Sequence, residues 1–159
     1  MAMNTGKVLA GGLLAGLIMN VLDMTWNYTI LAGDMKAMVD QLRLDPAVMT
    51  DLSYAVPWIV VDFVLGLVIV WNYAAIRPRL GPGPTTAILA GLVPYVAVTA
   101  VLCGFASIGV FSEAMILRGS LFALFNVVVA SLAGAWVYKE ADAASSADSV
   151  KQAERRAFQ

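Results

Sequence analysis

Four stretches of this sequence are each long and apolar enough to cross a lipid bilayer. An α-helix needs about 20 mainly apolar residues to span the hydrocarbon layer. Hydrophobic residues make up 60% of the chain and charged residues only 13%, whereas about a quarter of the residues of a soluble domain are charged. The sequence therefore predicts an all-α integral membrane protein. The predicted spans cover about 7–32, 57–76, 85–108 and 112–138.

The spans predict a four-transmembrane-helix bundle over residues 1–140, followed by a cytoplasmic tail over 141–159. The apolar run of the first span exceeds the 7 to 15 residues of a signal-peptide core, so we expect this span to be retained. Basic residues such as Arg77 and Arg79 lie on one side of the predicted membrane, and most acids of the loop at 33–56 lie on the other. The positive-inside rule then places both termini in the cytoplasm.

Two loops carry patterns of their own. The loop at 33–56 has apolar residues at helical spacing, which predicts a short amphipathic helix on the outer membrane surface. Those residues are Met35, Met38, Val39 and Leu42. Asp45 followed by Pro46 is a helix-start signal, so we expect a second short helix that extends to about Tyr54. In the cytoplasmic turn at 77–84, three prolines and two glycines predict that no helix continues.

A weak internal repeat relates the two halves of the chain. Val8–Gly11 in the first span is similar to Ile88–Gly91 in the third, and the second and fourth spans both end in Trp-x-Tyr. Two such units of two spans would be related by an axis along the membrane normal, as a 2+2 parallel repeat. Chance similarity is the alternative, because Ala, Gly and Leu are common throughout the chain.

One face of the first span carries polar residues in its outer half and small residues in its inner half. Asn20, Asp23 and Asn27 follow one another at spacings of three and four, and Gly12 and Gly16 continue the same face. A GxxxG pair lets a second helix approach closely, and polar groups inside a bilayer usually face the bundle interior. We therefore predict that Gly12 and Gly16 pack against another helix and that the polar residues bond to it.

The other spans contain partners for this polar face. Asp62 in the second span and Asn126 in the fourth lie roughly 20–22 Å from the cytoplasmic ends of their spans, close to the predicted height of Asn20 and Asp23. Arg118 lies farther from the cytoplasmic end of its span than Asn126 does, and its long side chain can reach a carboxylate or the headgroups. These residues predict one polar layer in the outer half of the bilayer. This layer is either a structural lock, in which the polar groups satisfy one another and fix the helix register, or a ligand, proton or ion site.

Composition excludes several kinds of chemistry. The chain has no histidine and one cysteine, Cys103, which excludes histidine-ligated haem, a Ser-His-Asp triad and an internal disulfide. A net charge of −1 gives no indication of nucleic-acid binding. Asp23 and Asp62 could act as a proton-sharing dyad, but neither lies in a recognisable intramembrane protease motif. We therefore predict a protein that is not an enzyme and uses no cofactor or metal.

Three segments resemble a group of small, uncharacterised four-span proteins of the bacterial inner membrane. They are the turn Ile76–Pro84, the Ala-Gly-Leu segment that leads to Asn20 and Asp23, and the ending Gly134–Glu140. The resemblance covers nearly all four spans and implies the fold and a multi-pass location in the bacterial inner membrane. It implies no activity and no site.

The predicted function is therefore binding or transport of a small molecule, proton or ion through the polar layer. The site residues for this function are Asn20, Asp23, Asn27, Asp62, Arg118 and Asn126. The alternative is an accessory or assembly subunit of a larger membrane complex, which the GxxxG face and the small size favour. The predicted partners are the lipid bilayer and either a second copy of the chain or the subunits of such a complex.

Overall fold

A computed structural model describes residues 3–138 and shows an all-α protein, as predicted. Four of its helices are long and apolar enough to cross a membrane. No strand occurs within the described residues. The predicted tail at 141–159 lies outside them. The helices are α1 (Thr5–Thr29), α2 (Ala32–Leu42), the 3₁₀ helix η1 (Pro46–Met49), α3 (Leu52–Leu80), α4 (Pro84–Ser107) and α5 (Glu113–Val137).

The first predicted span, 7–32, is too long at its outer end. Helix α1 ends at Thr29, and the backbone N–H groups of Ile30 and Leu31 both donate to the carbonyl of Trp26 before α2 begins. In the last turns of α1, the hydroxyls of Thr25 and Thr29 donate to backbone carbonyls four residues earlier, at 2.7 and 2.6 Å. Such side-chain bonds compete with the helical ladder. They weaken the helix where the apolar pattern alone predicts that it continues.

The loop between the first two spans contains the predicted helical segments in modified form. Helix α2 buries Val39 and exposes the Lys36–Asp40 ion pair, as expected of an amphipathic helix. The second short helix is a single 3₁₀ turn rather than a helix to Tyr54. The Asp45 carboxylate accepts a hydrogen bond from the N–H of Ala47 at its start. That α2 rests on a membrane surface stays a prediction.

Helix α3 extends beyond the predicted span 57–76 at both ends. Asp51 caps its first turn by accepting the N–H of Ser53 at 2.8 Å, and this backbone hydrogen bond holds the pKa of Asp51 below its usual value. At the other end α3 runs on to Leu80, so the turn predicted for 77–84 is shorter than expected, although no single helix continues through it. The helix passes through Pro78, because a proline near the end of a helix removes only one hydrogen bond of the ladder.

Glycine, rather than proline, ends α3. Gly81 has a φ of +83° and donates its N–H to the carbonyl of Arg77 at 2.9 Å, and Gly83 has a φ of +148°. Only glycine adopts such angles without steric cost. Pro84 is then the first residue of α4, where its missing N–H costs no hydrogen bond. The turn between α3 and α4 is therefore confined to residues 81–83.

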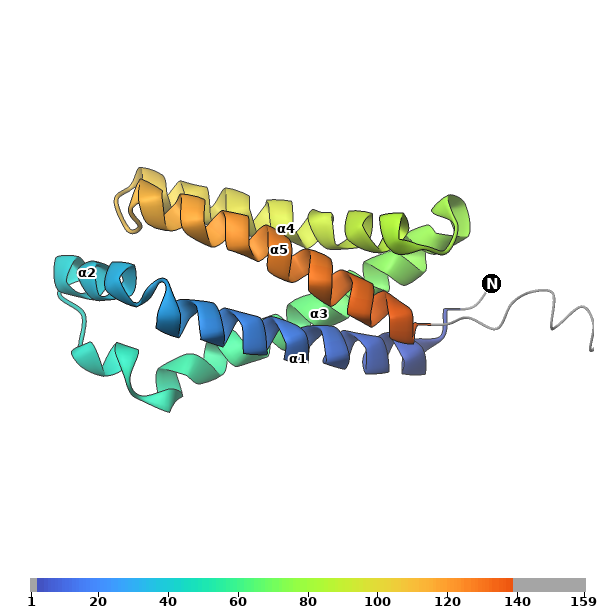
Figure 1. Cartoon of the computed structure of the whole chain (residues 1–159), viewed down its shortest axis with the longest axis horizontal. Helices are drawn as coiled ribbons and strands as arrows, with labels where there is room; N and C mark the ends of the chain where they lie inside the picture. Colours follow the sequence, from blue (N-terminus) through green and yellow to red (C-terminus); the bar gives the residue numbers. More distant parts are fainter. Residues whose placement is uncertain (1–2, 139–159) are drawn as a thin grey trace, which may run out of the picture.

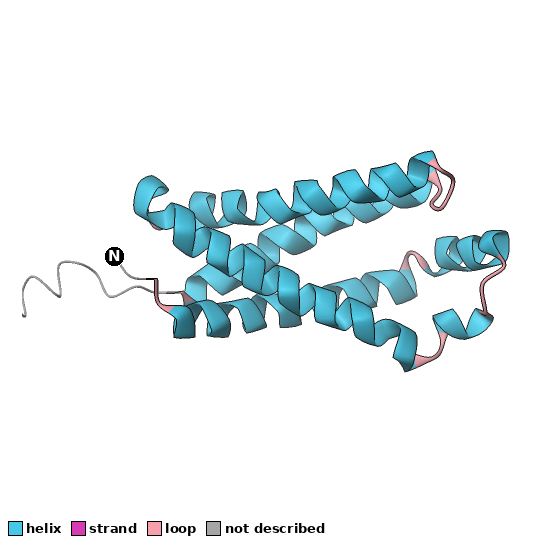
Figure 2. Cartoon of the chain, turned by 180° about the vertical axis from the view of Figure 1, so that it is seen from behind, coloured by secondary structure: helices cyan, strands magenta, loops and turns pink. Residues whose placement is uncertain are grey.

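The four long helices pack in a ring in which α3 and α5 cross between α1 and α4 (Figure 1). Buried residues concentrate in the half of the bundle near the N-terminus. They lie within 11–20 of α1, 66–74 of α3, 86–94 of α4 and 126–134 of α5. Toward the other end, which we call the α2 end, the ribbons divide into the α4–α5 hairpin and a group formed by α1, α2 and α3 (Figures 1 and 2).

Glycines bring the helices together in the packed half. A Cβ atom on Gly66 would lie 2.5 Å from the carbonyl oxygen of Gly12 and in contact with the backbone nitrogen of Gly16. A Cβ on Gly11 would lie 2.6 Å from the carbonyl oxygen of Gly134. The GxxxG face of α1 thus lies directly against α3, and the neighbouring Gly11 lies against α5. The 2+2 repeat stays a prediction.

A backbone carbonyl that Pro94 leaves without a donor in α4 is satisfied by a neighbouring helix. Pro94 has no N–H, so the carbonyl of Ala90 lacks its usual donor within α4. The side-chain Nδ2 of Asn72 in α3 donates to this carbonyl at 3.4 Å. Asn72 therefore links α3 to α4 by the one backbone acceptor that Pro94 leaves available.

We expect Asn72→Leu to lower the free energy of unfolding by about 1–2 kcal/mol, because the Ala90 carbonyl is left without a donor. Unfolding in mixed micelles by increasing SDS, followed by circular dichroism, measures this loss. In a Pro94→Ala background the residue at 94 supplies the missing N–H, so the same substitution should cost much less. An equal cost in both backgrounds would show that Asn72 acts in some other way.

Candidate functional site

A hydrogen bond between α1 and α5 lies at the centre of the predicted polar layer. The Nδ2 of Asn126 donates to the Asp23 carboxylate at 2.7 Å and to the carbonyl of Met19 at 3.3 Å. Asn126 is only 1% exposed, whereas Asp23 is half-buried. Both partners of Nδ2 are acceptors, so the orientation of the amide is determined. Its oxygen, Oδ1, points elsewhere and is buried without a hydrogen-bond partner.

Asn20 makes a similar arrangement between α1 and α3. Its Nδ2 donates to the carbonyl of Gly16 at 2.9 Å and to that of Ile59 at 3.3 Å. The residue is 6% exposed, and its Oδ1 is also buried without a partner. Two buried amide oxygens, one at each interface of α1, are therefore left as unused acceptors. Buried polar atoms normally have partners, so these two indicate a place where a donor or a cation can bind.

Asp62 reaches this layer from α3. Its backbone carbonyl faces Gly16, at 3.1 Å from the position of a Cβ atom there, and its side chain is half-buried. Ile59, three residues before Asp62 in α3, accepts a hydrogen bond from Asn20 of the layer. Within residues 3–138, the Asp62 carboxylate accepts no hydrogen bond and forms no ion pair. The structure thus brings together Asn20, Asp23, Asp62 and Asn126, which we call the polar layer.

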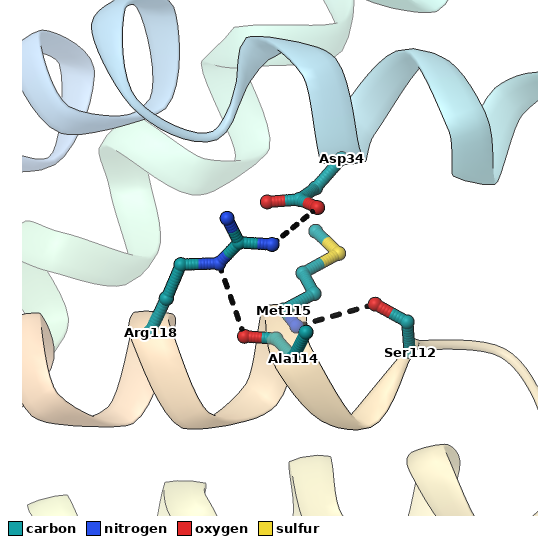
Figure 3. A network of polar contacts seen from close by, with 5 residues as sticks. All are labelled: Asp34, Ser112, Ala114, Met115 and Arg118. Carbon is teal, nitrogen blue, oxygen red and sulfur yellow. Dashed lines mark hydrogen bonds and ion pairs between the residues drawn. The ribbon is translucent and has the colours of Figure 1, made fainter.

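The other two predicted site residues lie outside this layer. Asn27 is exposed and donates to the backbone carbonyl of Asp23 in its own helix, at 2.8 Å. Arg118 forms an ion pair with Asp34 of α2 at 2.7 Å, while its Nε donates to the carbonyl of Ala114 at 3.3 Å (Figure 3). Arg118 was predicted to reach a carboxylate of the layer or the headgroups, and its pairing with Asp34 was not predicted. The sequence signal for this pair was an acid in the loop at the same end of the bundle as Arg118.

An aromatic pair that the sequence analysis also missed lies one turn beyond the layer, toward the α2 end. The rings of Trp26 and Phe122 stack with centroids 4.3 Å apart and planes 2° from parallel. Trp26 follows Asp23 by three residues, and Phe122 precedes Asn126 by four. These are the spacings of neighbours on one helical face, so they were a usable signal. The indole Nε1 is buried without a hydrogen-bond partner.

The polar layer has unused acceptors and no balancing cation among the described residues. It contains two carboxylates and two amide oxygens, and the arginine that was expected to approach it is bound to Asp34. No group of three or more His, Cys, Asp or Glu side chains that could hold a metal occurs within the described residues. Comparison of the chain with family models, with curated proteins and with solved structures finds no match in any of the three. The resemblance noted in the sequence therefore stays a prediction.

Proposed function

We propose that this chain is a non-enzymatic, multi-pass protein of the bacterial inner membrane that binds a proton or a small monovalent cation in the polar layer and passes it across the bilayer. The observation that carries the proposal is the pair Asp23 and Asp62, two acids inside the membrane-spanning helices with no cationic side chain beside them. Within residues 3–138, Arg118 is bound to Asp34 instead, and Lys7, Arg77 and Arg79 lie at the opposite end.

Charge balance is the physical reason. A charged carboxylate at the centre of a membrane helix costs several kcal/mol, about 3 on insertion scales, unless it is compensated. Asp23 has one amide donor, and Asp62 has none among the described residues. A bound proton or cation removes the repulsion between the two acids. The unused amide oxygens of Asn20 and Asn126 lie in the same layer and can bind that proton or cation as well.

The hydrogen-bonding atoms that the layer leaves unused are all acceptors, which favours this ligand class over anions. In a purely structural lock the polar groups would satisfy one another. Here two amide oxygens and the Asp62 carboxylate have no hydrogen-bond partner among the described residues. We therefore place the functional residues at Asn20, Asp23, Asp62 and Asn126, and leave Asn27 and Arg118 out of the site.

Carbodiimide labelling tests the proposal directly. Dicyclohexylcarbodiimide is lipid-soluble and reacts with protonated carboxyls in apolar surroundings. With protein in liposomes, we expect mass spectrometry to find the label on Asp62 or Asp23. Raising the pH should reduce labelling if the ligand is a proton, and adding Na⁺ at constant pH should reduce it if the ligand is a cation. Asp40→Asn, the same change at an exposed acid of α2, should have no effect.

Flux measurements test the transport step. In liposomes with an imposed membrane potential, we expect Asp62→Asn and Asp23→Asn to lower proton or Na⁺ uptake at least tenfold. Asp40→Asn should leave uptake unchanged. Absence of labelling together with unchanged flux would overturn the proposal. It would make the polar layer a packing lock and favour the accessory-subunit function.

A further inference from the structure

Three contacts close the α2 end of the bundle along one line, between the group formed by α1 and α2 and the α4–α5 hairpin. The first is the Trp26–Phe122 stack, and the second is the Asp34–Arg118 ion pair. The third is the hydrogen bond from Nε2 of Gln41 to the carbonyl of Gly109, at 3.1 Å. We call these three contacts the seam. It begins one turn from the Asp23–Asn126 hydrogen bond and runs away from the packed half.

The buried residues of the long helices lie away from this end. Figures 1 and 2 show the α4–α5 hairpin diverging from α1 and α3 toward the α2 end. In the packed half, by contrast, the glycine contacts hold backbone against backbone. A bundle that is rigid at one end and divided at the other can open by a small rotation of the hairpin, as in hinge motions of packed elements.

The helix breaks around α2 allow this movement. The chain leaves α1 at Ile30 and Leu31, and α2 ends at Arg43 in a left-handed conformation with φ +54°. Figure 3 shows Asp34 of α2 facing Arg118, whose guanidinium is oriented by its bond to the Ala114 carbonyl. The ion pair is partly exposed, with side-chain exposures of 20% for Asp34 and 48% for Arg118. Water and salt therefore compete with it.

We propose that the seam is a gate between the polar layer and the aqueous phase at the α2 end, and that the Asp34–Arg118 pair is its latch. With the latch closed, the aromatic stack covers Asp23 and Asn126. With it released, α2 and the hairpin separate, and water and the cation reach the layer. This inference rests on the proposed function, because it assigns the regulation of access to the same site.

A cysteine reporter at Met19 tests the gate. Met19 is 4% exposed, and its carbonyl accepts a bond from Asn126, so it lies on the closed side of the seam. The exposed native Cys103 is first replaced by alanine. In nanodiscs, the reaction rate of Met19→Cys with a membrane-impermeant methanethiosulfonate then reports water access. We expect Asp34→Asn and Arg118→Gln each to raise this rate about tenfold.

The matched controls separate the ion pair from other effects. The exchange Asp34→Arg with Arg118→Asp restores opposite charges and should restore the slow rate, while Asp40→Asn in the same helix should not change it. The proposal is overturned if neither latch variant alters the rate. It is equally overturned if the exchange fails to restore the slow rate, or if the reporter reacts as fast with the pair intact. Carbodiimide labelling needs no water path, so failure of the gate and failure of the cation site are distinguishable.

Discussion

Gly66→Ala is expected to lower the free energy of unfolding by about 3 kcal/mol, the upper end of the cost of overpacking a core. The added Cβ would meet the carbonyl oxygen of Gly12 at 2.5 Å and the backbone nitrogen of Gly16. Neither is the end of a flexible side chain, so α1 and α3 must move apart. SDS titration followed by circular dichroism measures the change, and the fraction of protein recovered as monodisperse particles provides a second measure.

Gly104→Ala is the matched control for this prediction. Gly104 also lies inside a long helix, but a Cβ atom there would have no neighbour within 4 Å. It should therefore be neutral or slightly stabilising, by up to about 1 kcal/mol, because alanine is the better helix former. If Gly66→Ala is as stable as Gly104→Ala, the close α1–α3 crossing is wrong. The position of Asp62 against Gly16 is then wrong with it.

Asn126→Ala is expected to have the second large effect, a loss of about 2–3 kcal/mol. The substitution removes the only donor to the Asp23 carboxylate among the described residues, and it leaves the Met19 carbonyl with one bond fewer. A buried acceptor left without its partner accounts for most of this cost. The same SDS titration gives the value for each variant.

A double-mutant cycle separates the bond from the cavity that Asn126→Ala also creates. In an Asp23→Ala background, Asn126→Ala should cost less by about 1.5 kcal/mol, which is the coupling between the two side chains. Asn27→Ala deletes the same kind of side chain at an exposed position and should change stability by less than about 0.5 kcal/mol. Additive effects of Asp23 and Asn126 would contradict the hydrogen bond.

Prediction from sequence succeeded where the signal is local. The spacing of Asn20 and Asp23 sets their shared helical face, and the residue counts from the inner ends placed Asp23 close enough in height to Asn126 for the hydrogen bond that joins them. These quantities depend only on the helix repeat and rise. Helix ends were less predictable. Helix α1 ends at Thr29, before the end of the predicted span, and the hydroxyl bonds of Thr25 and Thr29 with the backbone of its last turns are not visible in the apolar pattern.

The pairing of side chains between helices could not be predicted in the same way. Arg118 and Asp34 are 84 residues apart in the chain, and which acid an arginine meets depends on the rotation and tilt of two separate helices. The glycine contacts at Gly66 and Gly134 set those angles, and no local pattern encodes them. The Trp26–Phe122 stack depends on the same angles.

The sequence by itself determined that the described part of this protein is helical, with four helices long and apolar enough to cross a membrane and an acid within each of two of them. Scarcity of charge decides the first point, because burying so much apolar surface requires a bilayer, and helical periodicity decides the second. Only the tertiary structure decided that Arg118 is held by Asp34 and that Asp23 and Asp62 share a layer of unused acceptors. The physical reason is that charge balance inside a bundle depends on which groups packing brings into contact, and that packing is a property of all four helices together.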